Sequence, residues 1–101
     1  MDSTYSLHYS RFFLHQWERY DQNTRDFLQD KFALIKQDPF RFPTHRGYSR
    51  IRKIKLSREG KYQRLMFSIH RPEPNDILIL GIFPRDDDYQ EFERKFGELK
   101  K

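Results

Sequence analysis

The pattern of apolar and polar residues near the N-terminus predicts a short strand followed by a helix. Residues Tyr5–Tyr9 alternate between apolar and polar side chains, as a strand with one buried face does. Ser10 is a favourable N-cap, because its hydroxyl can accept a hydrogen bond from an amide of the first helical turn. Beyond it, Phe13, Trp17 and Tyr20 recur at helical spacing and form one apolar stripe. The chain is therefore expected to pass directly from strand to helix.

A second helical pattern follows a brief polar break at residues 21–23. It is expected to begin around Asn23 or Thr24 and to end at Asp38, because Pro39 disfavours helical geometry in the residue before it. The apolar stripe of this helix consists of Leu28, Phe32 and Ile35. Two amphipathic helices separated by so short a break predict a helical hairpin.

Three runs of strand-forming residues occupy the second half of the chain. They are Ser49–Leu56, Tyr62–His70 and Ile77–Phe83. A loop over Phe40–Tyr48 precedes them, Gly60 lies in the turn between the first two, and residues 72–76 form the next turn. The last run is apolar on both faces, which is typical of a central strand covered on each side.

The C-terminal residues predict a third helix. Its apolar stripe consists of Tyr89, Phe92, Phe96 and Leu99, and the acids Asp86–Asp88 suit the positive end of the helix dipole. The order strand, two helices, three strands, helix indicates an α+β fold with a mainly antiparallel four-stranded sheet. We expect one domain over residues 1–101, with the helical hairpin on one sheet face and the opposite face partly open.

Composition favours a folded protein despite a mean hydropathy of -1.03, because 17% of the residues are aromatic and disordered chains are poor in such residues. The absence of cysteine excludes disulfides and thiolate metal sites and is typical of the reducing cytoplasm. The N-terminus lacks the pattern of a signal peptide. The longest apolar run, Ile77–Pro84, is much shorter than the roughly 20 residues that cross a bilayer. A membrane association is therefore not expected.

Positive charge is concentrated in one segment of the chain. Arg41–Arg71 holds ten of the 20 Lys and Arg residues but only one of the 15 acids, so this segment carries +9 and the rest −4. A field of this kind attracts polyanions, which favours a nucleic-acid partner. A solvated basic face, or a patch that docks an acidic protein, is the alternative.

Strand alternation directs several cations of this segment to the same sheet face. In the first two long strands, Lys53, Lys55 and Arg64 share a face, and the phase of Ile77, Ile79, Gly81 and Phe83 in the last strand extends to Arg85. Tyr89 follows one helical turn later. Such a cluster destabilises a fold unless a polyanion relieves the repulsion, so it predicts a phosphate site. Each cation also has an ordinary explanation as a solubilising charge or an ion-pair partner, and Tyr89 as a packed aromatic.

At this point the chain resembles the RelE/ParE toxin superfamily, and in particular its RelE-like mRNA interferase branch. The motifs that carry the resemblance are Lys53–Leu56, the hairpin with Gly60, Arg64–Phe67, and Arg85 with Tyr89 four residues later. The position of the helical hairpin, the proline that closes the second helix and the strand order match as well. The resemblance therefore spans nearly the whole chain.

The resemblance implies the toxin of a type II toxin–antitoxin system, an endoribonuclease that cleaves mRNA on the ribosome without a metal or other cofactor. In this hydrolase a ribose 2′-OH attacks the adjacent phosphate. The implied partners are mRNA, the ribosome and a cognate antitoxin that is acidic, partly disordered and bound in a hetero-oligomer. The implied location is the cytoplasm.

The resemblance also implies roles for individual residues. Lys53 and Lys55 match the lysines that bind the phosphate and help to activate the 2′-OH, and Arg64 matches the arginine that stabilises the transition state. Arg85 matches the arginine near the leaving oxygen, and Tyr89 the tyrosine that orients or stacks on a base. Because the pKa of arginine exceeds about 12, charge stabilisation suits Arg85 better than proton donation. Candidates for contacts with the RNA backbone are Arg46, Arg50, Arg52 and Lys61.

One departure from the family pattern keeps other functions open. Pro84 stands where many relatives have histidine before the arginine. His70 could replace a missing base, although an ordinary turn histidine explains it better. A non-catalytic RNA-binding protein therefore remains an alternative, as does a ParE-like inhibitor of DNA gyrase, which would lack the catalytic cations.

Metal chemistry has little support in the sequence. His8, His15 and His45 show no ligand spacing with one another. Asp86–Asp88 could hold a divalent ion, but the start of a helix explains these acids as well.

Overall fold

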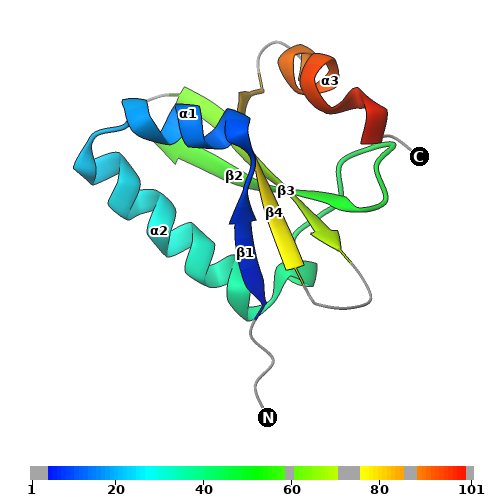
Figure 1. Ribbon diagram of the computed structural model, residues 1–101, viewed down its shortest axis with the longest axis horizontal. Coiled ribbons are helices and arrows are strands. Elements are labelled where there is room, and N and C mark those ends of the chain that lie inside the picture. The colour runs from blue at the N-terminus through cyan, green and yellow to red at the C-terminus, as the bar shows by residue number, and fades with distance from the viewer. Residues whose placement is uncertain (1–4, 59–60, 71–75, 86–88, 100–101) are drawn as a thin grey trace.

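The computed structural model describes residues 5–58, 61–70, 76–85 and 89–99. Within them lies a four-stranded sheet in the order β1-β4-β3-β2, with α1 and α2 on one side and α3 on the other (Figure 1). The strands are β1 Ser6–Tyr9, β2 Ile51–Arg58, β3 Lys61–His70 and β4 Asp76–Pro84. The helices are α1 Arg11–Arg19, α2 Gln22–Gln37 and α3 Gln90–Phe96. This arrangement confirms the predicted α+β class.

Side-chain caps fix where the two hairpin helices begin. The amide of Phe13 donates to Ser10 Oγ at 3.0 Å, which confirms the predicted cap of α1. Asp21 accepts from the amide of Thr24 at 2.9 Å and so starts α2 at Gln22, slightly before the predicted position. As expected, α2 ends before Pro39, where a short 3₁₀ helix begins.

The sheet combines one parallel pair of strands with two antiparallel pairs. β1 runs parallel to β4, and β4, β3 and β2 pair antiparallel in sequence. β4 therefore lies inside the sheet, as its apolar character on both faces predicted. β2 begins two residues later than expected, because Ser49 and Arg50 belong to a turn. The predicted turns at Gly60 and after His70 lie outside the described residues.

The sheet separates two hydrophobic cores. The first lies under the helical hairpin and includes Phe13 and Phe32 from the helices, packed against Phe67 and Ile79 from the strands. The second lies on the opposite face, beneath α3. Its buried residues are Tyr48, Ile51, Met66, Leu80, Phe83 and Phe92. The face that was expected to be partly open is thus closed by α3 at one end only.

The predicted phase of β4 is wrong at Ile77 and Ile79, because a β-bulge interrupts the strand. Met66 pairs with Gly81 while Phe67 pairs with Ile79, so β4 has one extra residue at this point. Ile77 and Ile79 consequently pack in the core under the hairpin, whereas Phe83 packs in the core under α3.

Two polar side chains, at the N-cap of α1 and within α1, form hydrogen bonds with the backbone of this bulge. Ser10 Oγ donates to the carbonyl of Leu80 at 2.8 Å. Gln16 donates to the carbonyl of Ile82 at 2.8 Å and accepts from its amide at 2.9 Å. The irregular stretch of β4 therefore keeps its polar groups paired inside the protein.

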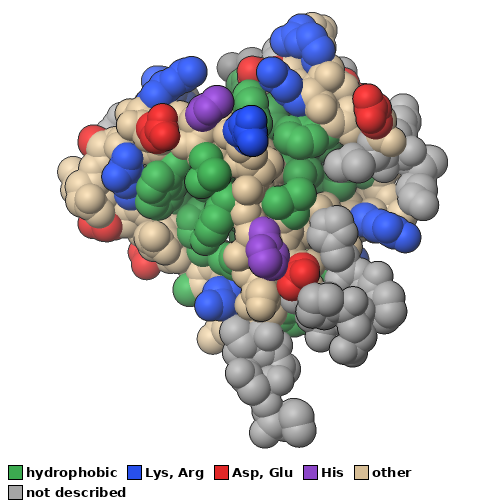
Figure 2. Space-filling model, in the orientation of Figure 1, with side chains coloured by type: hydrophobic (Ala, Val, Ile, Leu, Met, Phe, Trp, Pro, Cys, Tyr) green, Lys and Arg blue, Asp and Glu red, His purple; other side chains and the backbone are tan. Residues whose placement is uncertain are grey.

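An apolar groove lies beside β1 on the hairpin side of the sheet. Figure 2 shows hydrophobic side chains on both sides of β1, including the area framed by β1, α1 and α2. Tyr9 and Leu14 are 40% and 46% exposed, and they line the groove together with Phe13, Trp17 and Phe32. None of the described helices has the length and apolar character needed to span a bilayer.

We expect Gly81→Ala to destabilise the protein by about 2 kcal/mol or more. Gly81 has φ +154°, and a Cβ there would lie 2.8 Å from an atom of the Phe12 ring. Denaturant unfolding would measure the loss. Gly97→Ala is the matched control, because its Cβ would meet no atom closer than 3.9 Å and its φ is -60°. Equal stabilities of the two variants would contradict the close packing of Phe12 against Gly81.

Candidate nucleic-acid interface

Three of the predicted cations lie on the sheet face that α3 leaves open. Lys55 on β2 pairs directly with Arg64 on β3, and Lys53 pairs with Met66 one row along. Met66 packs in the core under α3, so its cross-strand partner Lys53 lies on that same face of the sheet. The same three side chains line a groove next to Phe42 and Pro43. The register inferred from the sequence for β2 and β3 therefore brings these cations together.

Tyr89 joins this group from the start of α3. The Nζ atom of Lys53 lies 5.1 Å from the centroid of the Tyr89 ring, within the range of a cation–π interaction. Tyr89 has φ 63° and ψ 27°, the left-handed conformation that is unfavourable for a bulky residue. Strain of this kind is often retained at functional sites.

Arg85 directly follows the end of β4, and no contact between its side chain and the other predicted cations is described. It is exposed and follows Phe83, the residue directly opposite Arg64, by two positions. Its amide donates to the carbonyl of Tyr62 at 3.3 Å. This backbone hydrogen bond places Arg85 at the same end of the β3–β4 pair as Arg64.

Lys53 is the titratable cation that this environment perturbs. Partial burial lowers its pKa from the ordinary 10.5, and the positive charges of Arg64 and Arg46 lower it further. A larger fraction of the amine is therefore neutral near physiological pH than for an exposed lysine. A neutral amine can accept a proton, which is what a general base requires.

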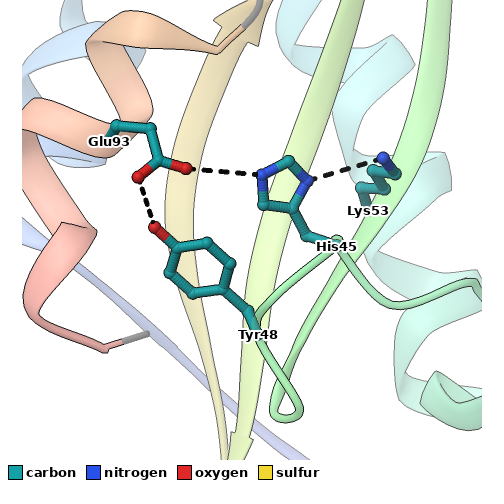
Figure 3. A network of polar contacts seen from close by, with 4 residues as sticks. All are labelled: His45, Tyr48, Lys53 and Glu93. Carbon is teal, nitrogen blue, oxygen red and sulfur yellow. Dashed lines mark hydrogen bonds and ion pairs between the residues drawn. The ribbon is translucent and has the colours of Figure 1, made fainter. Parts of the chain in front are cut away.

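A histidine that the sequence analysis set aside contacts this lysine. His45 is only 7% exposed, and its Nδ1 lies 3.5 Å from Lys53 Nζ. On its other side, Nε2 lies 4.0 Å from a carboxylate oxygen of Glu93 on α3, and that carboxylate also accepts a hydrogen bond of 2.8 Å from Tyr48 (Figure 3). The histidine shows no ligand spacing in the sequence, so only the folded loop reveals it.

Backbone hydrogen bonds hold the loop of His45 against β2. The His45 amide donates to the carbonyl of Ile51 at 2.8 Å, and the Lys53 amide donates to the carbonyl of Pro43 at 3.0 Å. Gly47 adopts φ 85°, a value that glycine tolerates, and so allows the turn that buries Tyr48. The segment expected as a plain loop is therefore an ordered wall of the site.

No protein-family model and no curated protein matches the chain. Among solved structures, the chain is similar to E. coli toxin RelE, in a mutant form in the free state, with a TM-score of 0.69. The match covers 92% of this chain and 98% of that one, at 21% sequence identity. This chain has a RelE-like fold. At 21% identity the similarity shows the fold alone, so any statement about chemistry has to rest on the side chains of this protein.

The remaining predicted RNA contacts occupy different positions on the RelE-like fold. Arg52 donates to the carbonyls of Phe40 and Phe42 at 3.2 and 2.6 Å, so its guanidinium ties the loop to β2. Arg50 and Lys61 are exposed, as is Arg46 near Lys53. Contacts of these residues with RNA stay a prediction, and the geometry favours a structural role for Arg52.

The structure contains no candidate metal site within the residues it describes, where no three His, Asp or Glu side chains come together. Asp86–Asp88, the acids that could have held a divalent ion, lie outside those residues.

We expect Tyr48→Phe to remove part of the pH dependence of stability in alkaline solution. The pKa of Tyr48 is raised from 10.0 to about 12 by burial and by the hydrogen bond and charge of Glu93. Between these values the phenol ionises in the unfolded chain but not in the folded one, so the free energy of unfolding should fall by about 2 kcal/mol as pH rises. Denaturant titrations at a series of pH values measure this slope.

The matched control for that experiment is Tyr62→Phe, because the Tyr62 side chain is exposed. Burial also raises the pKa of Tyr9 and Tyr20, so the slope should decrease in the Tyr48 variant and not disappear. Identical slopes in the wild type and Tyr48→Phe would contradict the raised pKa of Tyr48.

Proposed function

We propose that this protein is the toxin of a type II toxin–antitoxin system and acts as an endoribonuclease on mRNA. The observation that carries the proposal is the setting of Lys53, an amine with a lowered pKa beside Arg64 on an open, cationic sheet face. A site that combines a potential base with permanently charged neighbours suits cleavage of a phosphodiester. The RelE-like fold supports the same function, because the similar solved structure is that of a toxin.

In the proposed reaction, the ribose 2′-OH attacks the adjacent phosphate. Its proton passes to the neutral amine of Lys53 as the bond from O2′ to phosphorus forms. The bond from phosphorus to O5′ then breaks, and O5′ takes a proton from water. The products are a 2′,3′-cyclic phosphate and a 5′-hydroxyl end. No metal ion is part of this scheme.

The other cations would stabilise charge during this reaction. Lys55 and Arg64 face each other across β2 and β3, so both can approach the non-bridging oxygens of one phosphate. Arg85 would stabilise the leaving oxygen as a permanent charge, because arginine is a poor proton donor. Tyr89 would orient the RNA by stacking on a base.

The proposal extends to the partners of the toxin. Exposed cations around the cleavage site, such as Arg46, Arg50 and Lys61, would bind the backbone of mRNA and ribosomal RNA in the cytoplasm. An acidic antitoxin would keep the toxin inactive in a hetero-oligomer, either by covering the cationic face or by wrapping the helices. The apolar groove at Tyr9 and Leu14 offers a surface for the second arrangement.

We expect Arg64→Ala to slow mRNA cleavage by roughly 10²–10³-fold, the usual effect of removing one group that stabilises transition-state charge. The measurement is single-turnover cleavage of mRNA on purified ribosomes. Arg11→Ala is the matched control, because Arg11 is an exposed arginine on α1, away from this face. Equal rates for the two variants would remove Arg64 from the mechanism.

Mapping the 5′ ends of cellular mRNA after induction separates the proposed function from its alternatives. We expect codon-phased cuts in the wild type, and neither cuts nor growth arrest with Arg64→Ala or Arg85→Ala, provided that both variants remain folded. Intact mRNA together with DNA damage would indicate inhibition of gyrase instead. Intact mRNA and intact DNA, with RNA bound to the purified protein, would indicate a non-catalytic RNA-binding protein.

A further inference from the structure

His45 has no role in the proposed reaction, yet it is the histidine that lies against the reactive lysine. Its ring is buried between the sheet face and α3, and it contacts the rings of Tyr89 and Phe92 with centroid distances of 4.8 and 5.3 Å. The ring of Tyr48 lies 5.2 Å away on another side. Aromatic neighbours on several sides leave the imidazole little freedom to rotate.

The polar contacts of His45 give its two ring nitrogens different partners. Nδ1 lies 3.5 Å from Lys53 Nζ, and Nε2 lies 4.0 Å from Glu93 Oε2 (Figure 3). Lysine can donate a hydrogen bond in either protonation state, whereas an ionised carboxylate can only accept one. The arrangement therefore favours the tautomer that carries its proton on Nε2 and accepts from Lys53 through Nδ1.

Glu93 is itself held in place from the opposite side. Its Oε1 accepts from the buried hydroxyl of Tyr48 at 2.8 Å, and its amide donates to the carbonyl of Tyr89 at 2.9 Å. The chain of contacts runs from Tyr48 through Glu93 and His45 to Lys53. It links α3, the loop before β2 and β2 itself.

We propose that His45 is a positioning residue that holds the amine of Lys53 in its reactive place, with its own tautomer favoured by the nearby charge of Glu93. This inference rests on the proposed nuclease function, because it assigns the amine a reaction to be positioned for. By accepting a hydrogen bond from Lys53 Nζ, Nδ1 restrains this long and flexible side chain. The lone pair of the neutral amine stays available to accept the proton of the 2′-OH. The histidine does not touch RNA in this arrangement.

A merely structural histidine would behave differently. Its removal would lower stability, but any side chain that filled the space would serve equally well, and neither tautomer would be required. A positioning histidine needs an acceptor at the place of Nδ1. Asparagine can present its side-chain oxygen near that place, whereas the longer glutamine reaches toward the place of Nε2. The two amides therefore separate the alternatives.

The first test is nitrogen NMR of the full chain with ¹⁵N-labelled histidine. We expect the His45 signals, identified by their loss in His45→Gln, to show the tautomer protonated on Nε2. Glu93→Gln should weaken this preference, and His15→Gln, a change at an exposed histidine on α1, should leave it unchanged. A His45 ring protonated on Nδ1, or one that ignores the change at Glu93, would overturn the proposal.

The second test is single-turnover cleavage on mRNA-programmed ribosomes. We expect His45→Gln to lower the rate by about 10²-fold, the effect of misplacing a reacting group, with unchanged affinity for RNA. His45→Asn should retain several-fold more activity than His45→Gln, and His15→Gln should match the wild type. Equal rates for the Asn and Gln variants, or full activity in both, would overturn the positioning role.

The two tests also separate this inference from the function on which it depends. A wild type that cleaves no RNA would end the nuclease proposal, and with it the reaction that His45 is proposed to serve, even if the tautomer is as expected. An active wild type whose His45 has the other tautomer would preserve the nuclease and end the positioning role. If the His45 variants do not fold, single Gln variants of His8, His15 and His70 assign the other three histidines and leave the His45 signals identified. The tautomer of the wild type and its response to Glu93→Gln then decide the question.

Discussion

The β-bulge in β4 is the constraint on which the rest of the fold depends. Before the bulge, Ile77 and Ile79 pack under the helical hairpin, and after it Phe83 packs under α3. The extra residue changes which face each position takes, so that Leu80 packs under α3 and Ile82 packs under the hairpin. The chain pairs the irregular backbone with Ser10 and Gln16, so that burying it leaves its polar groups satisfied.

The candidate site follows from this change of phase. Phe83 meets Phe92 edge to face with centroids 5.2 Å apart, and this contact anchors α3 to the sheet. Once α3 is anchored, Tyr89 and Glu93 lie beside the loop of His45 and the side chain of Lys53. A regular β4 would turn Phe83 toward the hairpin instead, and α3 would lose its main aromatic contact with the sheet.

The sequence predicts most of the elements but only part of the site. Periodicity, caps and prolines locate the helices, and simple alternation places Lys53, Lys55 and Arg64 on one face. Alternation fails in β4, because the extra residue of the bulge moves every later side chain to the other face. The glycine inside this strand, Gly81, is the local signal that is compatible with a bulge. His45 escapes notice because its partners Lys53 and Glu93 lie on separate elements, and only the folded loop brings them together.

The distribution of lysine and arginine at the site has a physical logic of its own. Lysine can lose its proton when burial and like charges lower its pKa, whereas arginine stays charged in nearly every environment. The half-buried position beside His45 is occupied by Lys53, and the charges that lower its pKa come from Arg64 and Arg46. Each guanidinium therefore has two effects in the proposed reaction. It attracts the phosphate, and its charge adds to the effect of burial in lowering the pKa of Lys53. More of the amine is then neutral and able to accept a proton, so the repulsion that costs the free protein stability also helps to prepare Lys53 for the reaction.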